Sequence, residues 1–152
     1  MNLDQLKVIL VPTDFSDLSQ MALATAIQMA RAFQASITVL HVDVDPSLVL
    51  PPPADVVSIP LVFESMRVDT SEKLEAVAEQ VRRAGVACTA VSNTGRTHAA
   101  IVEQARQDGV GLIVMGSHAR HGFSHALLGS VAEKVVEYAP CPVLVVPSAG
   151  RG

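Results

Sequence analysis

The chain has 152 residues and a formal net charge of -4 at pH 7, so it is of ordinary single-domain length and lacks the basic balance of a nucleic-acid binder. Hydrophobic residues make up 49% of the chain and aromatic residues only 3%, which predicts a core of Val, Leu, Ile and Ala. Neither a signal-peptide pattern nor an apolar run of about 20 residues is present, so we expect a cytoplasmic protein with no membrane partner.

The first elements in chain order are a strand and a helix. Residues 7–11 form a continuous apolar run stopped by Pro12, which predicts a strand buried on both faces. Residues 13–17 supply turn and N-cap side chains, and Gln20 stands three places after Asp17. We therefore expect Asp17 to open the following helix in a capping box.

The rest of the chain continues this alternation of strand and helix. Apolar runs predict strands at residues 35–42, 86–91, 110–115 and 143–146, and helical spacing predicts helices at 63–83, 98–107 (capped by Thr97) and 131–138. The proline-rich residues 43–59 predict an extended loop, and residues 148–152 a flexible tail after one domain of residues 1–147. The pattern indicates an α/β fold, an open five-stranded parallel sheet with helices on both faces, similar to a Rossmann fold.

Ligands in such sheets bind beyond the carboxyl ends of the strands, where the direction of winding reverses. If the strand order is 3-2-1-4-5, the first and fourth strands are neighbours and the turns after them face one crevice. Asp14 follows the first strand and Gly116 follows the fourth. Asp14 either caps the first helix or hydrogen-bonds a ribose hydroxyl or a base, and the residues alone favour neither role.

A glycine-bearing loop from Gly116 to Ser130 leads into a helix, an arrangement that presents backbone N–H groups to an anion such as a phosphate. Gly116 could simply end a strand, but a second glycine and a hydroxyl residue at the helix start favour the phosphate site. Gly129 would let the backbone approach a ligand closely. Ser130 could cap the helix, donate its hydroxyl to a phosphate, or do both.

The same loop carries three histidines, His118, His121 and His125, and one guanidinium, that of Arg120. The histidine spacing matches no zinc signature, and no Cys or carboxylate joins the group, so we expect polar loop residues and no metal site. One or two of the histidines could contact a phosphate when a ligand is bound. Arg120 either reaches a terminal phosphate or faces solvent.

Five segments together resemble the universal stress protein family over nearly the whole chain. They are residues 11–16 (VPTDFS), 40–42 (LHV), 115–118 (MGSH), 127–135 (LLGSVAEKV) and 139–146 (APCPVLVV). The resemblance implies the strand order 3-2-1-4-5 and, for the nucleotide-binding branch of the family, an ATP site. The motif of that branch is glycine, two residues, glycine, nine residues, glycine, and then serine or threonine.

In this sequence the resemblance assigns Gly116 and Gly129 to the first and third glycines and Ser130 to the hydroxyl position. Ala119 stands in place of the second glycine. If that position needs a positive φ, alanine would cost roughly 1 kcal/mol or more, which would weaken binding about tenfold and not abolish it. Alanine also keeps the N–H donor.

The resemblance further implies that Pro12, Asp14 and Val42 line the adenine and ribose end, with Mg²⁺ accompanying the triphosphate. The ATP-binding residues expected in total are Pro12, Thr13, Asp14, Val42, Gly116, Ser117, His118, Ala119, Arg120, Gly129, Ser130 and Val131.

These features predict an ATP-binding stress protein that acts as a cytoplasmic regulator and not as an enzyme. The sequence has no glycine-rich Lys-Ser/Thr phosphate loop and no evident general base beside the loop, so any turnover should be slow. One alternative is an interaction module of the same fold that has lost nucleotide affinity through Ala119. A less supported one is an adenylate-transferring enzyme of related architecture.

The apolar, uncharged strand from Val143 to Val146 lies at a sheet edge in this topology. Such an edge tends to pair with another strand, so we expect a homodimer joined through it, as the family resemblance also implies. Alternatively, the tail covers the edge. A regulated protein partner is expected, but the sequence does not identify it.

Overall fold

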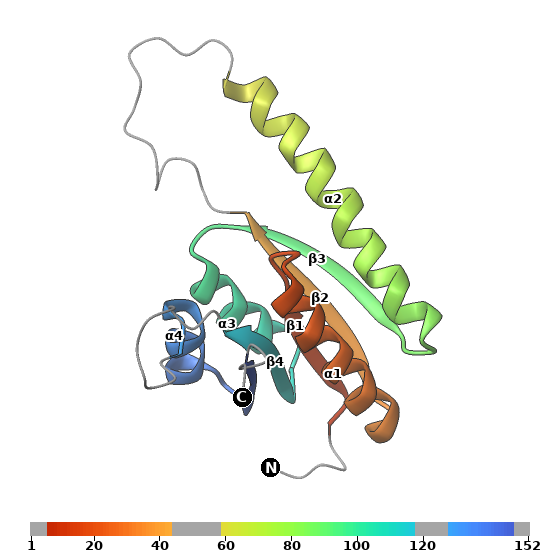
Figure 1. Ribbon diagram of the computed structural model, residues 1–152. Coiled ribbons are helices and arrows are strands. Elements are labelled where there is room, and N and C mark those ends of the chain that lie inside the picture. Colours follow the sequence, from red (N-terminus) through yellow and green to blue (C-terminus); the bar gives the residue numbers. More distant parts are fainter. Residues whose placement is uncertain (1–5, 44–58, 118–127, 148–152) are drawn as a thin grey trace, which may run out of the picture.

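The computed structural model describes residues 6–43, 59–117 and 128–147, with side chains described from residue 67 onward in the second range. Strands and helices alternate along the chain (Figure 1): β1 (Val8–Pro12), α1 (Asp17–Phe33), β2 (Ser36–Asp43), α2 (Ile59–Arg83), β3 (Cys88–Thr94), α3 (Thr97–Gln107), β4 (Leu112–Ser117), α4 (Ser130–Tyr138) and β5 (Val143–Pro147). Most of the loop expected at 43–59 and all of the expected tail lie outside the described residues. Within those residues, no helix combines the length and apolarity that a membrane span requires.

The strands form one parallel sheet in the order β3-β2-β1-β4-β5, which confirms the predicted fold class and order. β1 and β4 are neighbours, with Ile9 paired to Leu112 and Leu10 to Ile113. Because all strands run in the same direction, the turns that follow β1 and β4 leave the sheet at the same edge.

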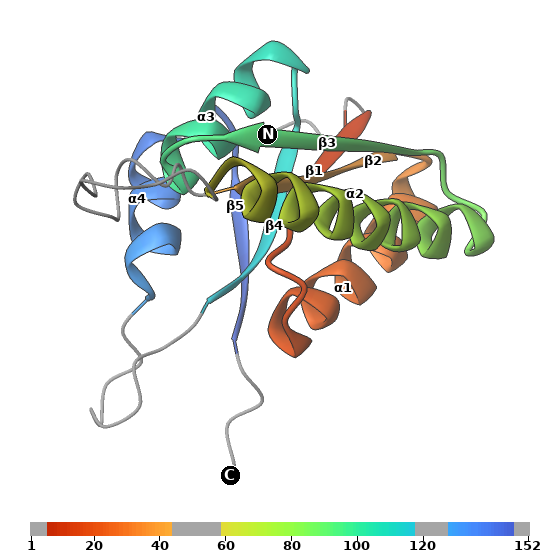
Figure 2. The same ribbon diagram turned by 90° about the horizontal axis from the view of Figure 1, so that it is seen from above.

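Helices cover both faces of the sheet, with α1 and α2 on one face and α3 and α4 on the other (Figure 2). Successive side chains of a strand point to opposite faces, as β1 illustrates. Ile9 and Val11 are fully buried on the α1/α2 side, and Leu10 is fully buried on the α3/α4 side. A strand covered on both faces needs a continuous apolar run, which explains the composition of residues 8–11.

The N-cap residues of α1 and α3 differ from the predicted ones. α1 is capped by Ser16, whose Oγ accepts a hydrogen bond from the Ser19 amide at 3.2 Å, and Asp17 is the first helical residue. The serine satisfies a first-turn amide, while the Asp17 carboxylate is still favoured by the positive end of the helix. α3 begins at Thr97 itself, and the cap position belongs to Arg96, whose backbone is extended.

All five strands end later than their apolar runs suggest: β1 at residue 12 and not 11, β2 at 43 and not 42, β3 at 94 and not 91, β4 at 117 and not 115, and β5 at 147 and not 146. The additional β3 residues are polar and pair with the end of β2, as Asn93 does with Val42. Main-chain pairing sets these ends, and it does not depend on apolar side chains. α2 begins at Ile59, before the expected residue 63, and Pro60 is tolerated because first-turn amides need no helical acceptor.

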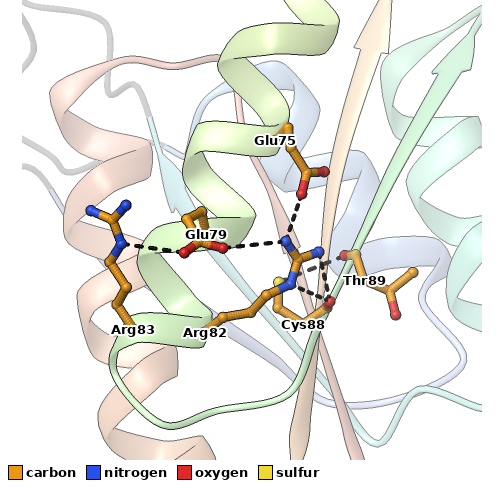
Figure 3. A network of polar contacts seen from close by, with 6 residues as sticks. All are labelled: Glu75, Glu79, Arg82, Arg83, Cys88 and Thr89. Carbon is orange, nitrogen blue, oxygen red and sulfur yellow. Dashed lines mark hydrogen bonds and ion pairs between the residues drawn. The ribbon is translucent and has the colours of Figure 1, made fainter.

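A polar network ties the end of α2 to the start of β3 (Figure 3). Arg82 donates to the Glu75 carboxylate and, at 3.3 and 3.2 Å, to the Cys88 carbonyl, while Glu79 lies 3.7 Å from Arg82 and 3.3 Å from Arg83. Burial raises the pKa of the Cys88 thiol, although nearby Arg82 acts in the opposite direction, so the thiol remains protonated at neutral pH. The network therefore holds the end of α2 against β3, an edge strand of the sheet, and the Cys88 thiol in it is not activated as a nucleophile.

Candidate functional site

A cavity of about 600 Å³ lies at the carboxyl edge of the sheet. Its lining comes from the ends of β1, β2 and β4 and from the starts of α1, α3 and α4, so the residues that follow β1 and the residues at the start of α4 meet there. The residues expected to bind ATP that line it are Pro12, Thr13, Asp14, Val42, Gly116, Ser117, Gly129, Ser130 and Val131. His118, Ala119, Arg120, His121 and His125 lie outside the described residues.

Thr13 is the buried centre of the turn after β1. Its Oγ1 donates to Ser19 Oγ at 3.1 Å and accepts from the Phe15 amide at 3.1 Å. Its own amide donates to the Leu40 carbonyl at 2.8 Å, which ties the turn to β2. The polar groups of Thr13 are therefore engaged within the protein, and its contribution to the site is to hold the shape of the turn.

Asp14 is exposed at the mouth of the cavity, and its carboxylate holds the cap residue of α1. Asp14 Oδ1 accepts from the Ser16 amide at 3.0 Å and from the Ser16 hydroxyl. The expected capping role is thus indirect, since Ser16 caps the helix and Asp14 orients Ser16. The same carboxylate lines the cavity, so the ribose role expected for it is compatible with this geometry.

Two further polar residues, His41 and Asp43, line the cavity at the end of β2. His41 Nδ1 lies 2.8 Å from the Thr13 carbonyl and must donate there, and its ring stacks on Phe15 with centroids 4.6 Å apart. Phe15 has a left-handed backbone (φ 64°), which these contacts and the Thr13 hydrogen bond hold in place. Asp43 Oδ1 lies 3.4 Å from His41 Nε2, and Oδ2 accepts from Ser92 at 3.4 Å.

Sequence reasoning missed His41 and Asp43. The family resemblance included residues 40–42 but implied a role for Val42 alone. The available signal was their place at the end of the second strand, because the ends of neighbouring parallel strands share one edge of the sheet.

Gly116 lies within β4 and lets α1 pack closely against that strand. A Cβ at this position would stand 2.6 Å from Leu18 Cγ and 3.0 Å from the Leu18 carbonyl oxygen. Such distances are shorter than a van der Waals contact, so a side chain there would displace the start of α1. Gly116 therefore has a packing role in addition to its place in the cavity wall, and it does not end the strand.

Ser117 and Gly129 connect the end of β4 to the start of α4. Ser117 Oγ accepts a hydrogen bond from the Gly129 amide at 2.9 Å. Gly129 occupies the cap position with φ -61° and ψ 155°, and Ser130 is the first helical residue and not the cap. Since this φ is accessible to any residue, the glycine is not required there by backbone conformation.

The cavity wall combines an apolar part with an acidic rim. Its buried apolar side chains include Leu40, Val42, Ile101 and Met115. Among the described lining residues, the acidic or basic side chains are Asp14, Asp43 and His41. In this part of the wall, the positive ends of α1, α3 and α4 supply the attraction for an anion. No three His, Cys, Asp or Glu side chains of the described residues are placed to hold a metal ion.

A second hollow, of about 610 Å³, lies at the opposite edge and is bordered by Lys7 and Arg31. α1 and α2 end there, so the hollow faces the negative ends of two helix dipoles. The two basic residues complement those helix ends without any ligand. Helix polarity, and not volume, therefore identifies the carboxyl-edge cavity as the candidate functional site.

Comparison with known proteins matches residues 5–147 to the universal stress protein family. A universal stress protein of Methanocaldococcus jannaschii is 38% identical over 141 residues, which cover 92% of this chain and 81% of that protein. Universal stress protein YxiE of Bacillus subtilis is 32% identical over 142 residues, 90% of this chain and 96% of that protein. The solved structure of universal stress protein UspA from Lactobacillus plantarum is 26% identical, with a TM-score of 0.78 over 93% of this chain and 97% of that one. With the sheet order and the motif segments in agreement, this chain belongs to the universal stress protein family.

Proposed function

We propose that the protein binds ATP in the carboxyl-edge cavity and acts as a cytoplasmic stress-response regulator whose state follows nucleotide binding. The observation that supports this most is the position of the α4 N-terminus at the same cavity as the turn after β1. The first hydrogen bond of α4 runs from the Glu133 amide to the Gly129 carbonyl, so the helix itself uses none of the amides at residues 130–132. Amides at the positive end of a helix are suitable donors to phosphate.

The strand order suggests how a nucleotide would lie. α4 follows β4, and the apolar wall at β2 is two strands away, which is about 10 Å at the usual strand spacing. Phosphates at the start of α4 would place the sugar over β1 and the base against Leu40, Val42 and Ile101. Asp14, at the end of β1, would then stand beside the ribose hydroxyls, in the role that the family resemblance implies.

Mg²⁺ is proposed to accompany the triphosphate. Proteins hold this ion mainly through phosphate oxygens, water and one or two carboxylates. Asp14 and Asp43 are the carboxylates of the described lining, and the ion would offset their repulsion of an anionic ligand.

One solved neighbour supports the choice of an adenine nucleotide. It is a universal stress protein in complex with cAMP, with a TM-score of 0.69 over 93% of this chain and 23% identity. At this identity the likeness shows a shared fold, so the complex is a precedent for an adenine nucleotide on this fold and assigns no contact in this chain.

Titration calorimetry of the full chain with Mg·ATP tests the proposal. We expect saturable heat and a rise in Tm, because a ligand at 100 times its Kd stabilises the native state by about 2.7 kcal/mol. Adenosine serves as the control for the part of the affinity that needs no phosphate. No heat and no thermal shift at millimolar Mg·ATP would reject ATP binding.

The alternative, an interaction module without nucleotide, is favoured by Ala119 at the second motif glycine. Ala119→Gly separates the two functions. If alanine is tolerated, the substitution should improve ATP affinity by about tenfold or less, the effect of about 1.4 kcal/mol. A change from no measurable binding to clear binding would instead show that this chain has lost its ligand.

We propose that hydrolysis is slow at most. The Asp14 carboxylate holds Ser16, and that of Asp43 contacts His41 and Ser92, so both already serve the turn and the strand ends. Phosphate release from Mg·ATP should therefore stay well below one turnover per second, whereas typical enzymes reach about 10 per second.

We also propose a homodimer through β5. This strand contains no charged residue, and Leu144 is 36% exposed on it. At the other edge of the sheet, Arg82 already occupies the Cys88 carbonyl. Light scattering should give twice the monomer mass at micromolar concentration, and Leu144→Asp should shift the protein to monomer because a buried unpaired charge opposes strand pairing.

A further inference from the structure

The last two residues of β4 point to opposite faces of the sheet. Gly116 faces α1, as its closeness to Leu18 shows. Ser117 continues the series of Ile113 and Met115, which belong to the core on the α3/α4 side. Ser117 is 5% exposed and borders the cavity, so a buried hydroxyl lies on the side from which α4 starts.

The hydroxyl of Ser117 positions the N-cap of α4. Its hydrogen bond with the Gly129 amide joins residues 12 apart in sequence and holds the residue immediately before the first helical turn. A hydroxyl has one donor and two acceptor sites. Accepting from Gly129 therefore leaves the Ser117 proton available for donation.

We infer that Ser117 is a positioning residue for the phosphate end of the nucleotide site. It sets where the first-turn amides of α4 stand relative to β4, and its proton donates to a phosphate oxygen. A hydroxyl that accepts one hydrogen bond is polarised and donates more strongly to a charged acceptor. The inference rests on the proposed ATP site, and it gives a specific role to Ser117, which the sequence placed among the ATP-binding residues without one.

A purely structural Ser117 would behave differently. Loss of a buried hydrogen bond would then lower stability and weaken all ligands of the cavity alike. A positioning role at the phosphate end weakens only ligands that carry phosphate. The ratio of ATP affinity to adenosine affinity is therefore the measurement that separates the two roles.

The experiment compares Ser117→Ala, Ser117→Val and Ser117→Thr with the unchanged full chain. Thr and Val have nearly the same shape and differ in the hydroxyl, so they form a matched pair that controls for the added methyl. We expect Ala and Val to weaken Mg·ATP binding by about 10-fold to 100-fold and Thr by no more than about threefold. Adenosine affinity, measured by NMR titration, should stay within about twofold in all variants.

Hydrogen exchange of the Gly129 amide, measured by NMR without nucleotide, provides a readout independent of ATP. Protection should fall in the Ala and Val variants and persist in the Thr variant. Unchanged ATP affinity in Ala and Val, equal losses for ATP and adenosine, or unchanged Gly129 protection would each overturn the inference. If the unchanged chain binds no ATP, the proposed function fails, and the exchange data still decide whether Ser117 holds α4.

Discussion

The two turns that meet at the cavity hold their helices by different means. In residues 13–19, after β1, the side-chain hydrogen bonds of Thr13 and Ser16 reach partners no more than six residues away, the Thr13 main chain bonds to β2, and the helix start is capped by a side chain. After β4, the described tie is one bond between Ser117 and Gly129, 12 residues apart, and the cap residue is a glycine without a side chain.

This difference indicates that the turn after β1 belongs to the scaffold and that the start of α4 belongs to the binding surface. The turn after β1 satisfies its own polar groups, so it keeps its shape without a ligand. At the start of α4 the helix leaves its first amides unused, and a bound anion could add hydrogen bonds there. Substitutions in the turn after β1 should therefore reduce the stability of the fold. Substitutions at the start of α4 should reduce the affinity for the nucleotide.

The largest effect on stability is expected where β4 packs against the start of α1. Gly116→Ala should lower the free energy of unfolding by about 1–3 kcal/mol, because the new Cβ overlaps Leu18. Urea unfolding measures the loss. Adding Leu18→Ala should remove only part of the strain, since the Leu18 carbonyl oxygen remains 3.0 Å away. If the free energy of unfolding of Gly116→Ala alone stayed within about 0.5 kcal/mol of the unchanged protein, α1 would be shown to shift without cost.

A smaller effect is expected from the buried hydroxyl of the first turn. Thr13→Val removes the donor to Ser19 Oγ and the acceptor of the Phe15 amide, and it should cost about 1–2 kcal/mol. Thr25→Val is the matched control, because Thr25 Oγ1 bonds only to the Met21 carbonyl of its own helix. Equal losses in the two variants, measured by urea unfolding, would contradict the scaffold role of Thr13.

The smallest effects come from the two helix-start serines, which sharpen the contrast between the turns. Ser16→Ala removes the cap of α1 and should cost about 1 kcal/mol of stability. Ser130→Ala should change stability by less than about 0.5 kcal/mol, since Ser130 is not a cap, but should weaken Mg·ATP binding. The reverse pattern, with Ser130 stabilising and Ser16 needed for ATP, would refute the division proposed for the two turns.

The fold could be predicted from sequence because strong local signals agree with one another. Continuous apolar runs such as residues 8–11 require strands covered on both faces, and their alternation with helical spacing requires parallel connections. Helix starts were predicted less well. Asp17 and Ser16 are both good cap residues, and only the backbone of the formed turn selects between them.

The candidate site likewise has features that the sequence predicted and features that only the tertiary structure decided. The chain itself determined that polar residues follow the first strand and that glycines and hydroxyl residues follow the fourth, and with the family resemblance this covered half of the residues that line the cavity. Tertiary structure decided that Gly116 admits α1, that Ser117 holds Gly129, and that His41 and Asp43 reach the same edge. These relations join residues that are far apart in sequence, and local patterns carry information only about near neighbours along the chain.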